Sequence, residues 1–379
     1  MSSPVLVSGL AEARALLSQP YAGEDLGLAS CPMILVEPTA ADLTQPTPTG
    51  LADLIGNIPA IIALSLPRGI DIADAPEPAD LRECFDMVLS PDDLTGPAAV
   101  PTQELDRITT AAAASPAAAV TLVQLLRLGE NLPTVDGLVA ESLAYSTLQS
   151  GPMFRDWLTT QPQRQPSNPP ARPVPAQRTS LSDPPPAVVA EKTGPADPPP
   201  PVVAERTGST LRLTLNRPQR HNAFSAEMRD GLVEQLRAAW ADPGLDGIVL
   251  DGAGPTFCSG GDLAEFGTTP DPATAHRIRS VRSAAFWLDR LAAKTRVLVH
   301  GTCVGAGVEL PAYAHDVIAH PSTTFRLPEV AMGLVPGAGG TVSLARRIGR
   351  QRLCYLALTN REIDATTALS WGLIDRIQH

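Results

Sequence analysis

The 379-residue chain is long enough for two or more domains, and its hydrophobic content of 44% supports a sizeable core. Its formal net charge of −11 is unevenly distributed, because residues 1–160 carry 20 acidic and 6 basic residues, or −14, and the rest carries +3. The acidic first half argues against a nucleic-acid partner, whereas the arginines of the second half suit an anionic ligand.

The cysteines and the apolar segments indicate the cellular compartment in which the protein is expected. The cysteines are odd in number, far apart and without a CxxC pair, which argues against a disulfide framework or a zinc site. They are Cys31, Cys84, Cys258, Cys303 and Cys354. The N-terminus lacks a basic stretch followed by an apolar core, so we expect no signal peptide, and no apolar run is as long as a membrane span. We therefore expect a cytoplasmic protein with no metal site and no membrane partner.

The first 160 residues predict strands followed by helices. Buried strands are expected in "CPMILVEP", "IPAIIALSLPRG" and "FDMVLSP", and the sequence is helical from Thr102 to Leu158. No cluster of His, Cys or paired acids marks chemistry there. We interpret residues 1–160 as an N-terminal α/β accessory domain with a structural or interaction role.

Residues 161–201 are dominated by Pro, Gln, Ser and Ala and are predicted to be a disordered linker. A near-perfect duplication lies in and beyond them, with "DPPPAVVAEKTG" at 183–194 and "DPPPPVVAERTG" at 197–208. We favour the copying of a strand entry into the linker. A polyproline II ligand for a proline-recognition module is the alternative.

After the linker, apolar strands alternate with helices, which is typical of an α/β fold with parallel strand pairing. Ser225 is a plausible N-cap of the first of these helices. The predicted helices are 225–242, 276–293, one from about 306, 338–349, 352–360 and 364–372. The predicted strands are 211–216, 247–252, 296–301, 316–321 and 323–328.

Glu309 and Glu329 are the residues that point most directly to chemistry. They lie twenty residues apart in the glycine-rich, otherwise apolar stretch 301–341. Two carboxylates that meet in a dry pocket can divide proton transfer, one accepting a proton while the other donates one. The alternative is that Glu309 pairs within a helix and that Glu329 is a turn residue after Pro328.

Five motifs in this half resemble the crotonase (enoyl-CoA hydratase/isomerase) superfamily in order and spacing. They are "LNRPQRHNAFS" (215–225), "FCSGGDLAEF" (257–266), "GTCVGAGVEL" (301–310), "LPEVAMGLVPGAGGT" (327–341) and "ALSWGLIDRI" (368–377). The resemblance covers about residues 202–377. It implies a crotonase-like ββα spiral core, so that residues 202–379 are read as the catalytic domain.

The resemblance also implies an oxyanion hole. Its donors would be the backbone amides of Gly261, in "SGGD", and Ala306, in "VGAGVE". Two amides fixed at a thioester oxygen stabilise an enolate, and the loss of one such donor typically lowers the rate by roughly 10²–10³. The start of a helix at Ala306 would add positive potential. Alternatively, both motifs are tight turns without a ligand.

For the glutamates, the resemblance implies hydration of a 2-enoyl-CoA. Glu309 would deprotonate the water that attacks C3, and Glu329 would deliver the proton to C2. The presence of both acids favours a hydratase over other crotonase-type enzymes, such as an isomerase or a tailoring enzyme of specialised metabolism. A non-catalytic acyl-CoA-binding scaffold is a third reading.

The remaining implied contacts hold the substrate, and no cofactor is implied beyond the coenzyme A of that substrate. Arginines and a histidine near 217–221 would meet the coenzyme A phosphates, or be solvated surface charges instead. The implied substrate-binding residues are Arg217, Arg220, His221, Ser259, Gly260, Asp262, Leu263, Gly305, Pro328 and Leu334.

Family members usually continue with a helical tail after the motif that ends here near residue 377, and the sequence predicts a catalytic domain without it. Residues 103–158 resemble that tail. We therefore hypothesise that residues 1–160 are a degenerate crotonase-like half. Its helices would fill the place of the absent tail, either within the same chain or from a neighbouring subunit. The resemblance implies a homo-oligomer, a trimer or a hexamer.

Overall fold

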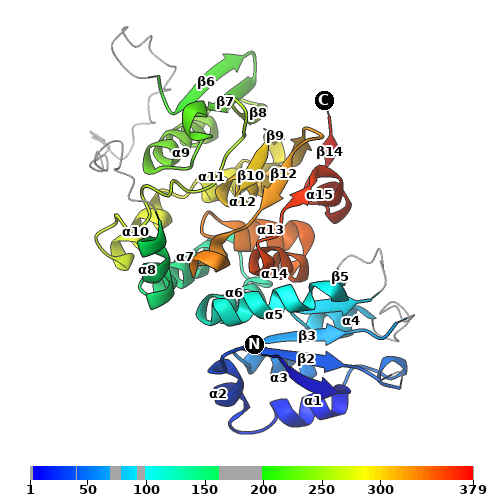
Figure 1. The fold of residues 1–379 in the computed structure, drawn as a ribbon. Coiled ribbons are helices and arrows are strands. Elements are labelled where there is room, and N and C mark those ends of the chain that lie inside the picture. Colours follow the sequence, from blue (N-terminus) through cyan, green and yellow to red (C-terminus); the bar gives the residue numbers. More distant parts are fainter. Residues whose placement is uncertain (1–2, 40, 69–77, 92–98, 162–198, 379) are drawn as a thin grey trace. The chain divides into compact units, whose positions relative to one another are not determined.

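A computed structural model describes residues 3–39, 41–68, 78–91, 99–161 and 199–378 (Figure 1). The predicted linker and the first copy of the duplication lie almost entirely outside these residues. The contacts between residues divide the chain into two compact units. Unit 1 comprises residues 1–132, 328–335 and 344–361, and unit 2 comprises residues 133–327, 336–343 and 362–379. Each unit is described by itself.

This division differs from the predicted boundary near residue 160. Residues 133–160 belong to unit 2, although they precede the linker. Two segments of the predicted catalytic domain, 328–335 and 344–361, belong to unit 1. Each unit therefore combines residues from both sides of the linker.

Among the described residues, the sheet of unit 1 has five strands, all parallel and in chain order. The central strands are buried along almost their whole length, as in a parallel sheet that is covered on both faces. This confirms the three strands predicted in the first half. The strands are β1 (Val5–Ser8), β2 (Met33–Glu37), β3 (Ile61–Ser65), β4 (Met87–Ser90) and β5 (Ala99–Pro101).

The helices of unit 1 are α1 (Leu10–Leu17), α2 (Ala22–Gly27), α3 (Leu51–Asn57), α4 (Pro78–Cys84), α5 (Leu105–Ala114), α6 (Pro116–Gly129) and α14 (Arg350–Thr359). The first four of them contribute to a core of buried, mainly aliphatic side chains. Helix α14 packs against α5, α6 and β4. No single helix among the described residues is long and apolar enough to cross a membrane. Only the stretches Thr102–Ala114 and Pro116–Gly129, bent by 107°, reach that length and hydropathy together.

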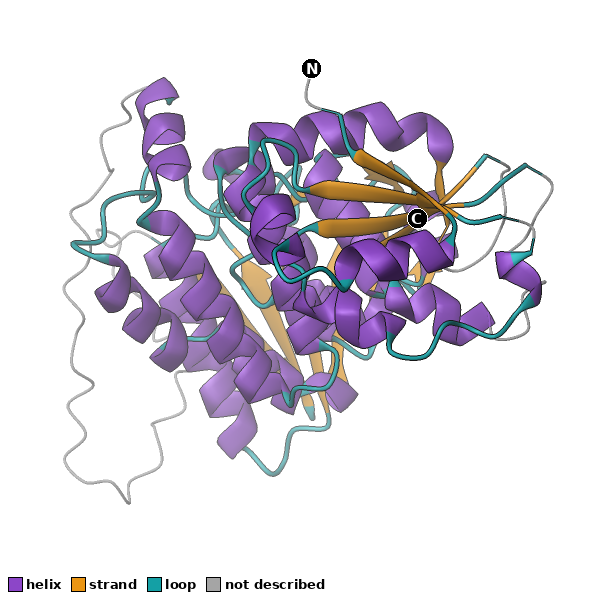
Figure 2. Cartoon of the chain, turned by 90° about the horizontal axis from the view of Figure 1, so that it is seen from below, coloured by secondary structure: helices purple, strands orange, loops and turns teal. Residues whose placement is uncertain are grey.

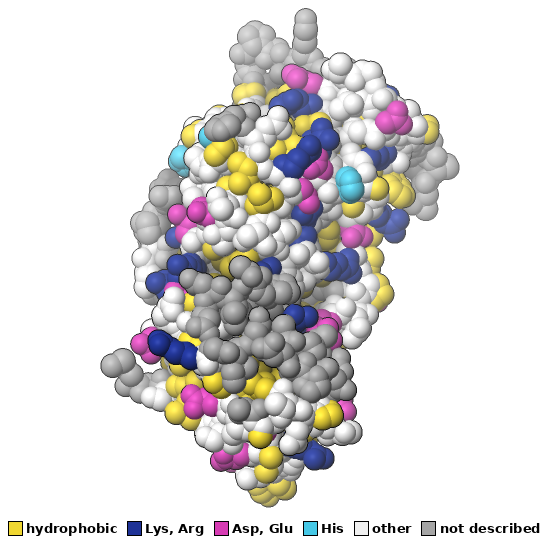
Figure 3. Space-filling model, turned by 90° about the vertical axis from the view of Figure 1, so that its right-hand side faces the viewer, with side chains coloured by type: hydrophobic (Ala, Val, Ile, Leu, Met, Phe, Trp, Pro, Cys, Tyr) yellow, Lys and Arg dark blue, Asp and Glu magenta, His cyan; other side chains and the backbone are white. Residues whose placement is uncertain are grey.

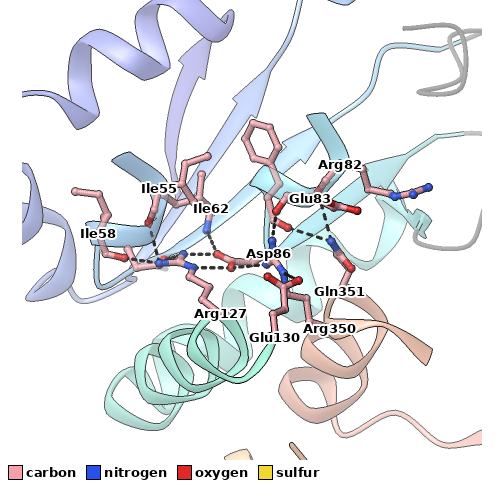
Figure 4. Close-up of polar contacts among 12 residues, drawn as sticks. Ile55, Ile58, Ile62, Arg82, Glu83, Asp86, Arg127, Glu130, Arg350 and Gln351 are labelled. Carbon is pink, nitrogen blue, oxygen red and sulfur yellow. Dashed lines mark hydrogen bonds and ion pairs between the residues drawn. The ribbon is translucent and has the colours of Figure 1, made fainter. Parts of the chain in front are cut away.

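A buried ion-pair network joins β3, α6 and α14 inside unit 1 (Figure 4). The carboxylate of Asp86 accepts hydrogen bonds from the Ile62 amide (2.8 Å), from Arg127 (2.8 and 2.5 Å) and from Arg350 (3.3 Å). Arg350 also pairs with Glu130 at 2.6 Å. Arg127 donates further hydrogen bonds to three backbone carbonyls, those of Ile55, Ile58 and Ala60. The charges of this core are thus matched by opposite charges.

In the part of unit 2 that the structure describes, there is a six-stranded sheet in the order β14-β11-β9-β8-β7-β6 and a three-stranded sheet in the order β10-β12-β13. The larger sheet is parallel except for the β6–β7 hairpin. The two-residue turn of this hairpin begins at Gly208, which has a positive φ of 61°. The strands are β6 (Val202–Thr207), β7 (Thr210–Leu215), β8 (Gly247–Gly252), β9 (Thr295–Val299), β10 (Thr302–Val304), β11 (Asp316–Ala319), β12 (Thr324–Arg326), β13 (Ile363–Asp364) and β14 (Arg376–Ile377).

The structure contains both helices and largely parallel sheets (Figure 2), which confirms the α/β class. The helices with residues in unit 2 are α7 (Thr134–Gln149), α8 (Pro152–Thr160), α9 (Ala226–Ala241), α10 (Pro272–Val281), α11 (Ala284–Arg290), α12 (Ala306–Glu309), α13 (Gly340–Ile348) and α15 (Ala365–Trp371). The predicted N-cap is confirmed, because Ser225 Oγ accepts a hydrogen bond from the Met228 amide. The predicted helix 276–293 is in fact two helices, since Ser283 caps a new helix, α11.

Helices α7 and α8 pack within unit 2, although they come from the first 160 residues. Helix α7 contacts α10 and α11, and the Trp157 ring of α8 lies 5.9 Å from the Phe266 ring. On the face drawn in Figure 3, basic and acidic side chains are interspersed. Such interspersion fits the arginine–carboxylate pairs at the surface of unit 2, for example Arg296 with Asp316.

Candidate active site

Two glycine-rich turns of unit 2, residues 259–261 and 305–307, touch each other through their backbones. The Val304 amide donates a 3.2 Å hydrogen bond to the carbonyl oxygen of Cys258. A Cβ atom at Gly307 would overlap that same carbonyl oxygen. Only glycine allows so close an approach of two backbones. The two turns that sequence analysis selected as amide donors are therefore adjacent.

The surroundings of these turns leave two amides available. The Phe224 amide donates to the Gly260 carbonyl at 2.7 Å, and the Gly305 amide donates to Arg326 at 3.0 Å. Among the hydrogen bonds between described residues, none is donated by the amide of Gly261 or Ala306. Helix α12 is a single turn, so the helix-dipole contribution expected at Ala306 is small.

Glu309 ends α12, and its carboxylate is buried and held by a glycine-rich loop. Its side chain is 2% exposed. One oxygen, Oε2, accepts hydrogen bonds from the amides of Ala338 and Gly340, both at 2.8 Å. The Glu309 carbonyl accepts a 2.8 Å hydrogen bond from Ser343 Oγ. Backbone donors therefore fix the carboxylate three residues after Ala306.

A second buried carboxylate, Glu141 of α7, holds the same loop. The Gly339 amide donates to its Oε1 at 2.7 Å, and the amide and hydroxyl of Thr341 donate to its Oε2 at 2.9 and 2.7 Å. Burial raises the pKa of Glu141 to about 7, although these hydrogen bonds and Arg279 oppose the shift. Sequence analysis did not identify Glu141, because its partners lie about 200 residues further along the chain.

Glu329, Pro328 and Leu334 belong to unit 1. Glu329 is half-buried and begins the 3₁₀ helix Glu329–Met332, and its carbonyl accepts a hydrogen bond from the Leu334 amide at 2.9 Å. Leu334 is fully buried. Because Glu309 belongs to unit 2, the convergence of the two glutamates on one water stays a prediction.

A family model described as enoyl-CoA hydratase/isomerase matches residues 205–378. This segment is thus similar to members of the crotonase superfamily. The matched segment includes both glycine-rich turns, Glu309 and Glu329. It excludes Glu141, although α7 is part of unit 2.

Several curated crotonase relatives resemble this segment. A mevalonyl-coenzyme A hydratase of Beauveria bassiana is 36% identical over 44% of this chain and 62% of that protein. A 2,3-dehydroadipyl-CoA hydratase of Escherichia coli is 35% identical (44% and 65% covered), and a 1,2-epoxyphenylacetyl-CoA isomerase of the same organism is 36% identical (43% and 64%). The chain thus spans less than two thirds of the length of these relatives.

Solved structures also resemble the crotonase segment. An enoyl-CoA hydratase of Mycobacterium smegmatis is 29% identical over 47% of this chain and 70% of that chain, with a TM-score of 0.45. A Thermobifida fusca protein in complex with acetoacetyl-CoA is 29% identical over 47% of this chain and 73% of that chain, with a TM-score of 0.43.

The basic residues expected to contact coenzyme A have partners within unit 2. Arg217 donates to the carbonyls of Pro199 and Asn216 and pairs with Glu227 at 2.7 Å. Arg220 pairs with Asp262 at 2.8 Å. A phosphate would therefore have to compete with these protein acceptors, so coenzyme A binding by the two arginines stays a prediction.

The loop around these arginines is held by a residue that the sequence did not indicate. Asn222 is fully buried, and its side chain accepts a hydrogen bond from the Arg217 amide and donates to the carbonyls of Ala253 and Thr256. Asn222 and His221 both have positive φ angles, near 50°. The His221 carbonyl accepts a hydrogen bond from the Ser259 amide at 3.0 Å, which ties the loop to the first glycine-rich turn.

Aromatic and acidic residues border the first glycine-rich turn. A Cβ atom at Gly261 would lie 2.8 Å from the Phe266 ring, so the ring packs directly on this glycine. Asp262 is buried and also accepts a hydrogen bond from the Ala264 amide, whereas Leu263 is 42% exposed. Position 261 therefore has no room for a side chain, while Leu263 remains accessible to solvent.

Cys258 lies next to the turn but is unsuited to nucleophilic chemistry. Burial raises the pKa of its thiol to about 12, and the negative charge of Glu309 adds to the shift. The thiol is therefore protonated at neutral pH and inert. Glu309 is thus the candidate reactive group beside the two turns.

Proposed function

We propose that the crotonase segment binds a 2-enoyl-CoA thioester and adds water across its double bond. The observation that carries the proposal is the buried carboxylate of Glu309, fixed by two amides beside the adjoining Gly261 and Ala306 turns. A general base must be oriented toward its water, and a thioester oxygen needs fixed donors as it gains charge. Both requirements fit residues of unit 2.

In the proposed reaction, Glu309 takes a proton from water while the water oxygen bonds to C3. The electron pair of the double bond moves toward the thioester, whose oxygen becomes an enolate held by the Gly261 and Ala306 amides. Glu329 then donates a proton to C2, and the carbonyl re-forms. The product is a 3-hydroxyacyl-CoA, and proton exchange with water restores both carboxyl groups.

The rest of the proposal concerns recognition and assembly. Arg217, Arg220 and His221 would lie near the coenzyme A phosphates, and Ser259, Gly305 and Leu334 near the acyl chain. The reaction needs no cofactor beyond the coenzyme A of the substrate, because amides and carboxylates supply its charge stabilisation. We propose a cytoplasmic homo-oligomer, a trimer or a hexamer.

A second candidate is isomerisation of an acyl-CoA, since a relative named 1,2-epoxyphenylacetyl-CoA isomerase is as similar as the hydratases. The same oxyanion hole would serve both reactions. The difference lies in whether the product gains a water, which is detectable as a mass increase of about 18 Da.

The test uses a panel of 2-enoyl-CoA thioesters that vary in chain length and branching. We expect the wild type to remove the ultraviolet absorbance of the conjugated thioester and to form a product heavier by one water. Glu309→Gln and Glu329→Gln should each lower kcat by roughly 10²–10⁴, the usual contribution of a general acid or base.

Glu205→Gln, an exposed substitution on β6, is the matched control and should keep wild-type turnover. Equal turnover in the wild type and both site variants would refute the hydratase mechanism. A product of unchanged mass that still depends on Glu309 would favour the isomerase.

A further inference from the structure

One face of α7 lies along the loop that holds Glu309. Gly137, Glu141 and Tyr145 are spaced four residues apart and so share one side of the helix. A Cβ atom at Gly137 would lie 2.8 Å from Val342 Cγ2, and a Cβ atom at Gly337 would overlap the Tyr145 ring. The helix and the loop therefore fit each other over three successive turns of the helix.

Successive backbone amides of the loop donate hydrogen bonds to two different carboxylates in turn. The amides of Ala338 and Gly340 point to Glu309, whereas those of Gly339 and Thr341 point to Glu141. Gly339 has a φ of 103°, a conformation that favours glycine. Since successive amides bind opposite carboxylates, a shift of the loop toward or away from Glu141 moves the donors of Glu309 as well.

Helix α7 is itself firmly anchored in unit 2. Arg279 of α10 donates hydrogen bonds to Ser142, Ser146 and Gln149, and its guanidinium stacks 4.6 Å from the centre of the Tyr145 ring. At the start of the helix, the Thr134 hydroxyl donates to Asp289 at 2.9 Å. Glu141 therefore holds the loop from a fixed support.

We infer that Glu141 is a positioning residue, which sets the orientation of the Glu309 carboxylate through the loop 337–341. The inference rests on the proposed function, in which Glu309 is the general base. Glu141 itself touches no reacting atom. Its removal should misplace the base rather than remove the substrate site, and so should lower kcat while KM changes little. A misplacement of about 1 Å can lower a rate by roughly 10²-fold.

The principal variant is Glu141→Gln, which keeps the shape of the side chain. Its amide group can accept at most two of the three hydrogen bonds, because one oxygen is replaced by an NH₂ donor that would face an amide N–H. A second variant, Thr341→Val, removes only the hydroxyl donor from the loop side. It keeps the inference testable if Glu141→Gln does not fold.

The matched control is Ser146→Ala on the same helix. Ser146 bonds to Arg279 and to the Pro272 carbonyl, so its loss weakens the docking of α7 without touching the loop. For the full-length wild type and each variant, three quantities are measured: the melting temperature, the hydrogen exchange of the peptide covering residues 336–343, and kcat and KM with the best 2-enoyl-CoA.

For Glu141→Gln we expect faster exchange in 336–343 and a kcat lower by about 10–100-fold, with KM within about 3-fold of the wild type. Thr341→Val should show the same pattern more weakly. Ser146→Ala should lower the melting temperature and keep kcat. Unchanged exchange in Glu141→Gln, or an equal loss of kcat in Ser146→Ala, would overturn the inference.

The experiment distinguishes a failure of the inference on Glu141 from a failure of the proposed hydratase function. If the wild type hydrates no thioester, the hydratase proposal fails, and exchange alone decides the role of Glu141. Faster exchange in Glu141→Gln and Thr341→Val, but not in Ser146→Ala, then supports its hold on the loop, and equal exchange in all three contradicts it.

Discussion

The two units bury carboxylates in opposite ways. Asp86 of unit 1 and Glu141 of unit 2 are both 2% exposed. Asp86 faces two guanidinium groups, those of Arg127 and Arg350. Glu141 faces two amides and a hydroxyl, and the cation of Arg279 acts on it only through its electrostatic field. The difference is whether the negative charge is matched by a positive charge in direct contact.

This difference changes how burial acts on the charged groups of each unit. Although burial disfavours the Arg127 cation, Asp86 more than offsets this and raises the pKa of Arg127 above its usual value. At Glu141, burial outweighs the hydrogen bonds and raises the pKa of the carboxyl group to about 7. Arg127 therefore stays a cation at all ordinary pH values, whereas Glu141 changes its protonation near neutral pH.

Substitution at Asp86 should give the largest effect on stability. Asp86→Asn would leave Arg127 and Arg350 buried without their shared counter-ion, and breaking a buried pair in this way typically costs about 3–5 kcal/mol. We expect the opening free energy of β2 and β3 to fall by that amount, measured by native-state hydrogen exchange. The control Asp53→Asn, exposed on α3, should change it by less than about 0.5 kcal/mol. A similar small change for Asp86→Asn would show that this network does not stabilise unit 1.

Much of each unit could be predicted from the sequence where the signal is local. Strands β2, β3, β4 and β9 follow apolar runs, and the Ser225 cap precedes an amphipathic helix. The break between α10 and α11 was missed, because the apolar spacing continues across Arg282 and Ser283. Only the backbone shows that Ser283 starts a new helix.

The sequence motifs predicted the residues of the candidate site, but not the residue that holds the neighbouring loop in place. Gly261, Ala306 and Glu309 stand in short motifs whose residue types imply their chemistry. Glu141 has no such motif, because its partners Gly339 and Thr341 are 198 and 200 residues away in the chain. The available signal for Glu141 was a charged residue on the buried face of α7. This signal could not be used, because a sequence alone does not show which helix faces are buried.

Because no positive charge directly contacts Glu141, we expect the stability of unit 2 to depend on pH. Its folded pKa of about 7 exceeds the ordinary value of 4.5. The unfolded carboxyl group therefore loses its proton at lower pH than the folded one. Stability from this group is complete below about pH 4.5 and is lost as pH rises to about 7, by an amount on the order of 3 kcal/mol.

The measurement compares the unfolding free energies of the wild type and Glu141→Gln between pH 4.5 and 8. All four tryptophans lie in unit 2, so their fluorescence reports on that unit. As pH rises from 4.5 to about 7, the unfolding free energy of the wild type should fall relative to that of Glu141→Gln. Above about pH 7 the difference between the two proteins should stay constant. Arg279, whose charge acts on Glu141, and Glu309, which binds the same loop, are present in both proteins. A constant difference would mean that Glu141 keeps one protonation state.

Substitution in the exposed ion-pair cluster around Asp316 should have the smallest effect on stability. Asp316 lies between Arg296, at 2.7 Å, and Arg376, but both arginine side chains are 53% exposed. Water and salt screen such pairs, which typically contribute about 0–1 kcal/mol. We expect Asp316→Asn to lower the unfolding free energy of unit 2 by less than about 1 kcal/mol, with the difference shrinking in 0.5 M NaCl, as followed by tryptophan fluorescence in urea. A loss as large as that for Asp86→Asn would show that burial is not what separates the two clusters, and that the pairing of one carboxylate with two guanidinium groups is sufficient by itself.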